Sequence, residues 1–374
     1  MKVTATTPAS ARRDFTQAIP SVVQSTLDAL AAADDRTGNP PVVALEYLIS
    51  CGAATAVLPV SLGGAEFGWS PHASAALGRW LRRLGASHLS LARLYEGHVN
   101  AFQLIWTYGD AGQRETLCRY VKDGGWLGVW TAPHASGPLA LTGGGNQYEL
   151  DGHKVYASGA GLIRCPLVTA QHELLGYVMV WPSANYLIGP KAEWDMLGMR
   201  ASVTLPIHYH HAPVAPSEII GSDNDYHREP IFTAGAWRFL AAQLGAGERL
   251  GLLATQSLIR AGRQADPHQR SRLADIAIAL ESATLWVERA RLAADGEPTG
   301  HEPSHVVRMA RLAVEQQLMA VMQLVHRAIG LSAFRRDNPI ERITRDLETY
   351  LRQPVPDLLR EQVGEQFAAL VKPA

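Results

Sequence analysis

The sequence predicts an α+β protein that is mostly helical, with its strands confined to the middle of the chain. Between about residues 20 and 120, apolar residues recur at helical spacing. Short, partly alternating segments follow, separated by Gly, Pro and Asn clusters, a pattern typical of strands. From about residue 230 the helical period returns and persists in three long segments, 234–263, 272–294 and 305–334.

This order of elements predicts three consecutive parts. We expect a helical domain over residues 1–122, a β domain over 123–229 and a four-helix bundle over 230–374. In the first part, Gly63-Gly64 lacks the strand and the GK[ST] ending of a phosphate-binding loop and is interpreted as a turn. In the second, Gly143-Gly144-Gly145-Asn146 predicts a hairpin connection, since a strand-like segment follows it.

Composition excludes several classes of protein. Hydrophobic residues make up 47% of the 374 residues and charged residues 18%, which fits a globular protein. A formal net charge of −1 without a basic stripe argues against nucleic-acid binding. Three scattered cysteines indicate neither a disulfide framework nor a zinc site. Met1–Ile19 lacks the apolar core of a signal peptide and no run of about 18 apolar residues occurs, so we expect a cytoplasmic protein without a membrane span.

Four segments carry a resemblance to a known family. The sequence Arg335-Arg336-Asp337-Asn338-Pro339-Ile340-Glu341-Arg342 leads on to Arg345-Asp346, which resembles the segment before the last helix of the acyl-CoA dehydrogenase superfamily. In the β region the segments 129–137, 151–159 and 196–202 are similar to the family's flavin-facing loops. The resemblance implies the acyl-CoA dehydrogenase fold, with a β-barrel-like middle domain and a four-helix bundle that pairs subunits into a homodimer or homotetramer.

The same resemblance implies a flavin cofactor, FAD with FMN as an alternative. A flavin needs donors at its polar edge and flat apolar surface elsewhere. It would lie beside a set of β-region residues, Trp130, Thr131, Tyr156 and Ser158. Arg263 and Gln269 of the bundle would serve the pyrophosphate of a flavin in a neighbouring subunit. Here Asp266-Pro267 replaces the family's Phe-Gly pair, which weakens the expected contacts on the adenine side.

The catalytic glutamate of acyl-CoA dehydrogenases is missing from both places where the family carries it. After the Arg-Asp signature the chain reads Tyr350-Leu351-Arg352-Gln353-Pro354, and the earlier helix has Trp237-Arg238. Neither Trp nor Arg removes a carbon-bound proton. We therefore interpret Trp237, Arg238, Arg352 and Gln353 as substrate-side residues, with a cation suited to an anionic or carrier-linked substrate.

A second branch of the superfamily, the two-component flavin monooxygenases similar to dibenzothiophene monooxygenase and amino-sugar N-oxygenases, agrees better. Ala157-Ser158-Gly159 resembles a loop of that branch, and His98 stands on the helix where its members often carry a histidine. The resemblance implies that His98 and Ser158 stabilise the oxygen adduct of reduced flavin, supplied by a flavin reductase.

The sequence also fits two alternatives. One is an acyl-CoA or acyl-carrier dehydrogenase with a relocated base, Glu348 or Asp357. The other is a non-catalytic homologue that keeps the bundle for assembly. No metal site is expected: in His208-Tyr209-His210-His211 the last histidine of a regular strand points away from the others, and no adjacent carboxylate completes a site.

Overall fold

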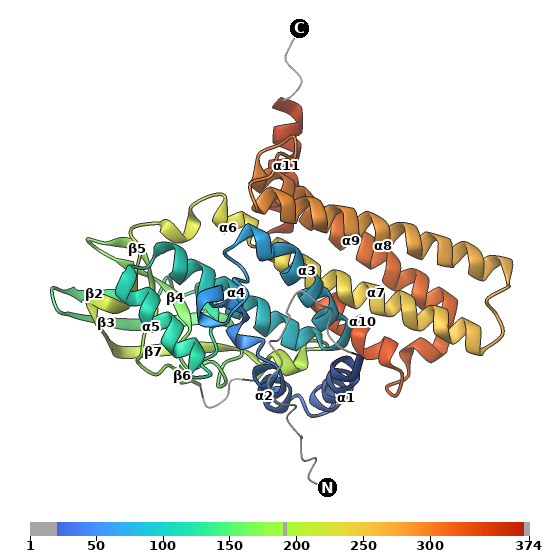
Figure 1. Ribbon diagram of the computed structural model, residues 1–374, viewed down its shortest axis with the longest axis horizontal. Coiled ribbons are helices and arrows are strands. Elements are labelled where there is room, and N and C mark those ends of the chain that lie inside the picture. Colours follow the sequence, from blue (N-terminus) through green and yellow to red (C-terminus); the bar gives the residue numbers. More distant parts are fainter. Residues whose placement is uncertain (1–20, 190–192, 370–374) are drawn as a thin grey trace.

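The computed structural model describes residues 21–189 and 193–369, and it has the predicted order of helices, sheet and helical bundle (Figure 1). The expectation about Met1–Ile19 lies outside these residues. The helices of the first part are α1 (Ser21–Thr37), α2 (Val42–Ser50), α3 (Pro71–Ser87), α4 (Leu89–Tyr108) and α5 (Ala111–Lys122). Short 3₁₀ turns over Ala54–Val57 and Val60–Leu62 carry the chain from α2 to α3.

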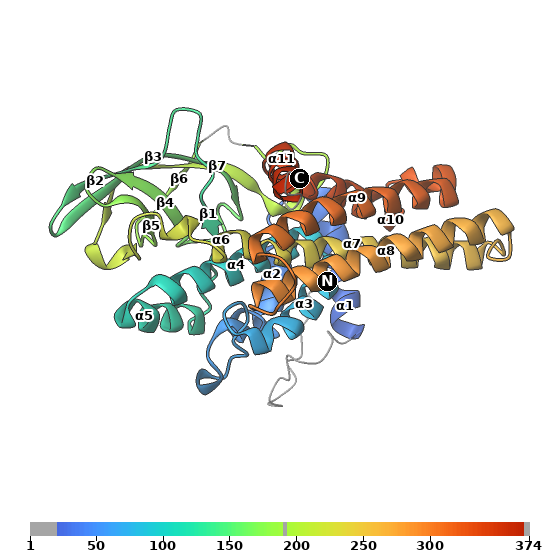
Figure 2. The same ribbon diagram turned by 90° about the horizontal axis from the view of Figure 1, so that it is seen from above.

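The middle part is a mixed sheet of eight strands. They are β1 (Val129–Trp130), β2 (Ala140–Gly144), β3 (Gln147–Ser158), β4 (Leu167–His172), β5 (Gly176–Val180), β6 (Leu187–Ile188), β7 (Thr204–Val214) and β8 (Ile219–Ile220). Their order is β6-β7-β3-β2-β4-β5-β8, and β1 pairs in parallel with β4. The predicted hairpin is present, because β2 and β3 pair antiparallel around Gly145-Asn146. Figure 2 shows α4 and α5 on one side of this sheet.

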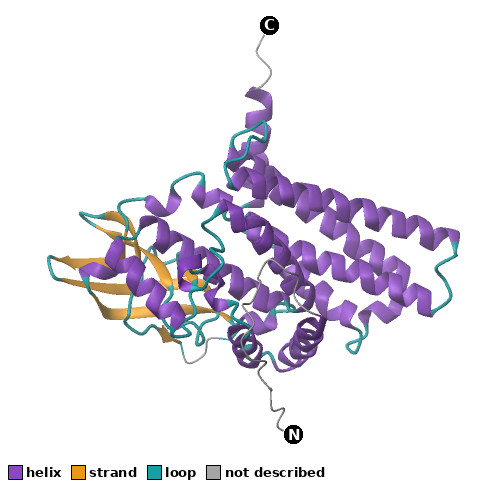
Figure 3. Ribbon diagram, in the orientation of Figure 1, coloured by secondary structure: helices purple, strands orange, loops and turns teal. Residues whose placement is uncertain are grey.

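The last part consists of α6 (Ile231–Ala234), α7 (Trp237–Arg260), α8 (Pro267–Ala294), α9 (Pro303–Ile329), α10 (Pro339–Tyr350) and α11 (Pro356–Ala369). Helices α7, α8 and α9 run side by side and extend away from the sheet (Figure 3). None of the helices within the described ranges is long and apolar enough to cross a membrane.

Local chemistry explains where the long helices begin and end. Helix α8 begins at Pro267, five residues before the predicted start, because the Asp266 side chain accepts a hydrogen bond from the His268 amide and proline has a preset φ. Helix α9 begins in the same way, with Glu302 accepting from the His305 amide. It ends at Ile329 rather than at 334, since Gly330 has a φ of +71°.

The charged segment that the sequence singled out binds other parts of the chain. The Arg345 guanidinium contacts both carboxylate oxygens of Asp35 on α1, at 2.8 and 3.1 Å, and those of Glu341, at 2.7 and 2.9 Å. Asp346, which is buried, accepts a hydrogen bond of 2.6 Å from the Met199 amide and lies 3.5 Å from Arg342. These charges therefore join α10 to the N-terminal helices and to the loop that precedes β7.

Candidate functional site

A cavity of about 440 Å³ lies where the three parts of the chain meet. Its walls come from α4, β1, the segment from Tyr226 through the start of α7, one face of α9 and the segment 353–362. This volume is within the range of about 300–1,000 Å³ that small-molecule sites have. Of the residues that the sequence predicted, Thr131, Arg238 and Gln353 line the cavity.

One wall is a polar stripe on the otherwise apolar helix α4. Arg93, Glu96, Asn100 and Gln103 follow at spacings of three, four and three, so they share one helix face. Glu96 is 3% exposed. Its carboxylate is paired with Arg93 and accepts hydrogen bonds from Asn100 Nδ2, at 2.5 Å, and from the Tyr350 hydroxyl, at 3.3 Å. These partners hold a charge inside the protein that would otherwise be costly to bury.

A buried guanidinium forms the next part of the wall. Arg238 Nη1 and Nη2 donate to Asn100, to Gln103 and to the carbonyl oxygen of Gly68, at 2.6–2.8 Å. Its Nε has no hydrogen-bond partner among the described residues, and no carboxylate of those residues forms an ion pair with it. Burial lowers the pKa of Arg238 to about 10. A cation held by neutral acceptors in this way favours an anionic ligand.

Two hydroxyl groups face the cavity from the sheet side. Thr131 Oγ1 and the Tyr226 hydroxyl are hydrogen-bonded at 3.0 Å, and both residues line the cavity. Burial raises the pKa of Tyr226, so this phenol remains a donor near neutral pH. Behind them, the fully buried Lys154 donates to the Thr131 carbonyl oxygen at 3.1 Å and to Thr169 Oγ1 at 3.0 Å. The backbone of Thr131 is thereby fixed from below.

The two predicted flavin-facing loops lie against each other. Trp130 Nε1 donates to the Ser158 carbonyl oxygen at 2.9 Å, and the Ser158 hydroxyl accepts from Thr204 Oγ1 at 3.0 Å. Neither Trp130 nor Ser158 lines the cavity. Tyr156 is 68% exposed and has a φ of +56°, within an irregular stretch of the β3–β7 pairing. Trp130 and Ser158 thus hold the loop that carries Thr131, while Tyr156 faces outward.

His98 differs from the expectation of a free catalytic donor. The ring is fully buried and stacked on Trp126, with centroids 4.6 Å apart. Nε2 donates to the Ala54 carbonyl oxygen at 2.9 Å, and Nδ1 accepts from the Leu127 amide at 3.0 Å. Burial lowers the pKa of His98 to about 4. Both nitrogens of this neutral ring are therefore already hydrogen-bonded, and His98 joins α4 to the segments around Ala54 and Leu127. His98 does not line the cavity.

The bundle residues predicted to serve a flavin phosphate lie at the far end of α7 and α8, away from the sheet (Figure 1). Gln269 is buried, and with its amide oxygen turned toward the guanidiniums it accepts from Arg263 at 2.7 Å and from Arg272 at 3.1 Å. Arg263 itself is exposed. Within one chain it does not reach the cavity, so a contact between Arg263 and a cofactor requires a second subunit.

The other predicted substrate-side residues divide in two. Gln353 lines the cavity, and its amide donates to the Tyr350 carbonyl oxygen at 2.6 Å. Arg352 is exposed and pairs with Glu315 at 3.1 Å, while Trp237 is buried against a separate, smaller pocket. Arg352 and Trp237 do not line the main cavity.

The carboxylates considered as a relocated base lie elsewhere. Glu348 and Asp357 are exposed and do not line the cavity. The two carboxylates that line it are Glu96 and Glu229. Glu229 accepts a hydrogen bond from the Ser304 hydroxyl at 2.7 Å and forms an ion pair with Arg308 at 3.3 Å.

Sequence reasoning missed this second set of cavity residues, which comprises Arg93, Glu96, Asn100, Tyr226 and Arg311. The spacing of polar side chains along α4 is the signal that could have identified the first three. Arg311 has no such signal, because it reaches the cavity only through bundle packing: it donates to the Pro354 carbonyl oxygen at 2.9 Å and lies 5.7 Å from the Phe239 ring centroid. Burial lowers the pKa of Arg311 to about 10.

The donor set of the cavity fits a flavin ring. The hydroxyl pair of Thr131 and Tyr226 and the guanidinium of Arg93 suit its polar edge, and the apolar lining, which includes Phe239, suits its flat surface. The unpartnered Nε of Arg238 is a donor that a bound molecule could satisfy. No metal ligand set is needed for this arrangement.

Comparisons with known proteins agree with this description. Residues 246–352 match the family described as acyl-CoA dehydrogenase, C-terminal domain. L-evernosamine nitrososynthase of a Micromonospora species is 27% identical over 357 residues, covering 86% of this chain and 82% of that protein. Dibenzothiophene monooxygenase of Mycolicibacterium goodii is 24% identical over 205 residues, which is 51% of this chain. That second match spans about half of the relative's own length, 48%.

Solved structures show the same fold over nearly the whole chain. TdsC from Paenibacillus sp. A11-2, in complex with FMN and indole, has a TM-score of 0.83 and 18% identity, covering 94% of this chain and 96% of that one. Butyryl-CoA dehydrogenase from Megasphaera elsdenii has a TM-score of 0.82 and 18% identity, covering 98% of this chain and all of the other, 100%. The chain therefore has the fold of the solved acyl-CoA dehydrogenase, as its sequence predicts, and its residues 246–352 are similar to the C-terminal domain of that family.

Proposed function

We propose that this protein is a flavin-dependent monooxygenase that uses reduced flavin and O₂ on a small or carrier-linked substrate carrying an anionic group. The observation that carries the proposal is the 440 Å³ cavity, in which hydroxyl donors and a guanidinium without a carboxylate partner face apolar walls. The likeness to a nitrososynthase and to dibenzothiophene monooxygenases supports the oxygenating branch. A flavin reductase would supply the reduced cofactor.

The residues of the chain would divide the work between ring and substrate. Bound reduced flavin supplies the electrons that activate O₂. The hydrogen-bonded pair of Thr131 and Tyr226 would donate its one remaining hydroxyl hydrogen to the flavin's polar edge, and Lys154 would keep the Thr131 backbone in place. The aromatic and aliphatic walls would exclude water, which suppresses side reactions of reactive intermediates with water. Ser158 and His98 would act through the positions of the loops that they hold.

Arg238 and Arg311 would bind the anionic part of the substrate. Burial lowers the pKa of both guanidiniums to about 10, and Arg308, which also lines the cavity, is already paired with Glu229. A charge-assisted hydrogen bond in such surroundings is worth about 1.5–3 kcal/mol. Arg238 and Arg311 are therefore the main candidates for substrate selection, whereas Arg352, predicted as a substrate-side residue, does not line the cavity.

For the cofactor we propose FMN ahead of the FAD expected from the resemblance. FMN-bound TdsC supports this choice. FAD would in addition need Arg263 and Gln269 from a second subunit, at a turn where Asp266-Pro267 replaces the family's Phe-Gly pair.

A homo-oligomer accompanies the proposal. Large apolar side chains are exposed on the outer surface of α7 and α8: Leu252, Ile259, Ile278 and Leu285, from 48% to 66%. A further groove of about 320 Å³ runs between α8 and α9 beside Ile278. Apolar surface of this extent on two long helices is typical of a protein–protein interface, and a second copy of the bundle is the partner we propose.

The test is anaerobic titration of the purified protein with reduced FMN and reduced FAD, followed by mixing with O₂. Thr131→Val removes one hydroxyl group and should weaken the binding of reduced FMN by about five- to tenfold, equivalent to about 1 kcal/mol. Thr116→Val, an exposed threonine on α5, is the matched control and should leave the affinity unchanged. Absence of flavin binding by the wild-type protein would overturn the proposal and favour a non-catalytic homologue.

A dehydrogenase remains the second candidate because Glu96 places a carboxylate in the cavity. It would replace Glu348 and Asp357 as the relocated base. Anaerobic bleaching of bound oxidised flavin by an acyl thioester, abolished in Glu96→Gln, would favour it over oxygenation. No bleaching by the wild-type protein would exclude it.

A further inference from the structure

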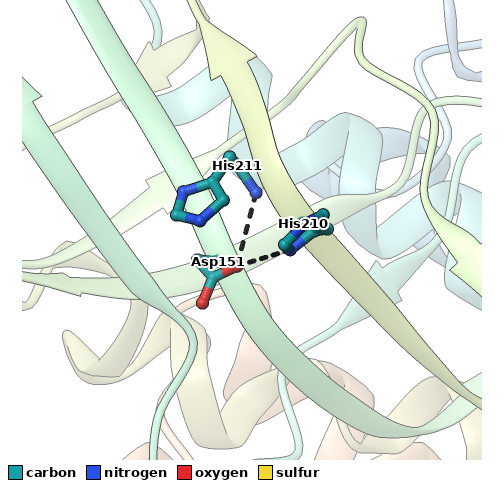
Figure 4. A group of neighbouring side chains, drawn as sticks. All are labelled: Asp151, His210 and His211. Atoms are coloured by element: carbon teal, nitrogen blue, oxygen red, sulfur yellow. Dashed lines mark hydrogen bonds and ion pairs between the residues drawn. The ribbon is translucent and has the colours of Figure 1, made fainter.

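Among the described residues, one group of metal-ligating side chains lies outside the cavity. Asp151 on β3 and His210 and His211 on β7 each offer one ligand atom, and these atoms all lie within 4.8 Å of one another (Figure 4). His210 Nδ1 is 3.5 Å from Asp151 Oδ1, and the His211 amide donates to the same oxygen at 3.3 Å. The structure thus brings a carboxylate to the histidine run where the sequence showed none.

A β-bulge creates this arrangement. Leu150 pairs with Ala212 and Gly152 with Tyr209, so Asp151 alone faces both His210 and His211. In a regular strand, consecutive side chains point to opposite faces. Here His211 has a φ of +45°, a backbone conformation that residues other than glycine rarely adopt, and both imidazoles lie beside one carboxylate. The sequence expectation that His211 points away rested on a regular strand, which the bulge breaks.

The ligand types suit zinc. Two imidazoles and a carboxylate form a set that binds Zn²⁺ with a fourth position left for water. Bonds of about 2.0–2.1 Å in a tetrahedron place neighbouring ligand atoms about 3.3 Å apart. The distance of 3.5 Å between His210 and Asp151 is close to that value. Glu149 Oε2 lies 3.2 Å from His211 Nδ1, and such a carboxylate orients a metal-bound imidazole through its other nitrogen.

Further imidazoles continue along the same strands. His208 lies next to His210, with ring centroids 6.1 Å apart, and it stacks on His153 at 5.0 Å. Hard cations such as Mg²⁺ prefer oxygen ligands. A site with two imidazoles favours an ion of intermediate softness, such as Zn²⁺.

We propose that Asp151, His210 and His211 form a surface site for Zn²⁺ that fixes the bulge between β3 and β7. None of the three residues lines the cavity, so the site is independent of the proposed flavin chemistry. An ion there would link the two strands and stabilise the sheet by mass action.

The experiment uses the full chain, treated with a chelator and then titrated with ZnCl₂ in a calorimeter. We expect one Zn²⁺ per chain, a rise in Tm on saturation, and no heat with MgCl₂. His210→Asn and Asp151→Asn should each weaken Zn²⁺ binding at least tenfold and remove the rise in Tm. His268→Asn, which changes an exposed histidine on α8, should leave both unchanged.

Two outcomes would overturn the proposal. One is the absence of Zn²⁺ binding by the wild-type protein. The other is Zn²⁺ binding that is unchanged in both His210→Asn and Asp151→Asn, whether or not His153→Asn abolishes it. The ion would then lie elsewhere. Far-ultraviolet circular dichroism of each variant separates lost ligation from lost folding, and the exposure of His210 favours intact folding.

Discussion

His98 should make the stability of the flavin-free protein fall as the pH is lowered from 7 to 5. Burial lowers its pKa from 6.5 to about 4, so between these values the unfolded chain binds a proton that the folded chain excludes. The stability is therefore fully present above pH 6.5 and is lost progressively toward pH 4. Using 1.36 kcal/mol per pKa unit, the loss attributable to His98 between pH 7 and pH 5 is about 2 kcal/mol.

The assay is urea unfolding of the wild-type protein and of His98→Gln at pH 7, 6 and 5. At pH 7 the variant should be less stable by about 2–3 kcal/mol, because the Ala54 carbonyl or the Leu127 amide loses its buried partner. The difference between the two proteins should then shrink by about 2 kcal/mol at pH 5, since glutamine does not titrate. His268→Gln, at an exposed site, should follow the wild-type profile. Parallel profiles for the wild type and His98→Gln would refute the assignment of His98 as a buried neutral ring.

Three other predictions concern the packing of the chain and its assembly. Arg345→Lys loses the contacts with both oxygens of each carboxylate and should lower the free energy of unfolding by about 1–3 kcal/mol. Arg335→Lys, which changes an exposed ion pair, should leave Tm unchanged. Equal shifts of Tm in the two variants would contradict the role of Arg345. Burial lowers the pKa of Lys154 to about 8, so above that pH the unfolded chain binds more protons than the folded chain. Between pH 7 and pH 9.5 the free energy of unfolding of the wild type should therefore rise by about 2 kcal/mol relative to that of Lys154→Met. A difference between the two proteins that stays constant with pH in urea unfolding would refute this prediction. Ile278→Asp should dissociate the oligomer in light scattering, unlike Leu174→Asp at an exposed turn, and a monomeric wild type would exclude the interface.

The sequence predicted the fold well because periodic patterns report on burial. The period of α7, α8 and α9 was visible as apolar residues at helical spacing, and the hairpin at Gly145-Asn146 as a cluster of turn residues. Helix ends were less predictable, since they depend on single capping groups such as Asp266. Because Asp266 caps its N-terminus, α8 begins five residues before the predicted start.

The candidate site was only partly predictable because its residues come from distant segments. Thr131 and Arg238 were identified through motifs, and both line the cavity. His98 was also found by its position, but only the structure shows that the Ala54 carbonyl and the Leu127 amide occupy both of its nitrogens. Such contacts join segments that no spacing in the sequence connects.

The zinc site was missed for a related reason. Strand alternation placed His210 and His211 on opposite faces, which holds for regular strands. The register shift opposite Asp151 and the positive φ of His211 are set by the pairing of β3 with β7. A residue on a partner strand, and a bulge in the pairing, leave no mark in a single sequence.

The proposed function requires that the cavity beside Thr131 and Tyr226 bind reduced flavin and control its reaction with O₂. Rapid mixing of the protein–reduced FMN complex with oxygenated buffer tests it most directly, with the absorbance of oxidised flavin as the readout. We expect a delay before that absorbance appears, and this delay should be shorter in Thr131→Val than in the wild type at saturating protein. Reoxidation of FMN with the wild-type protein at the rate of free FMN, without a delay, would contradict it.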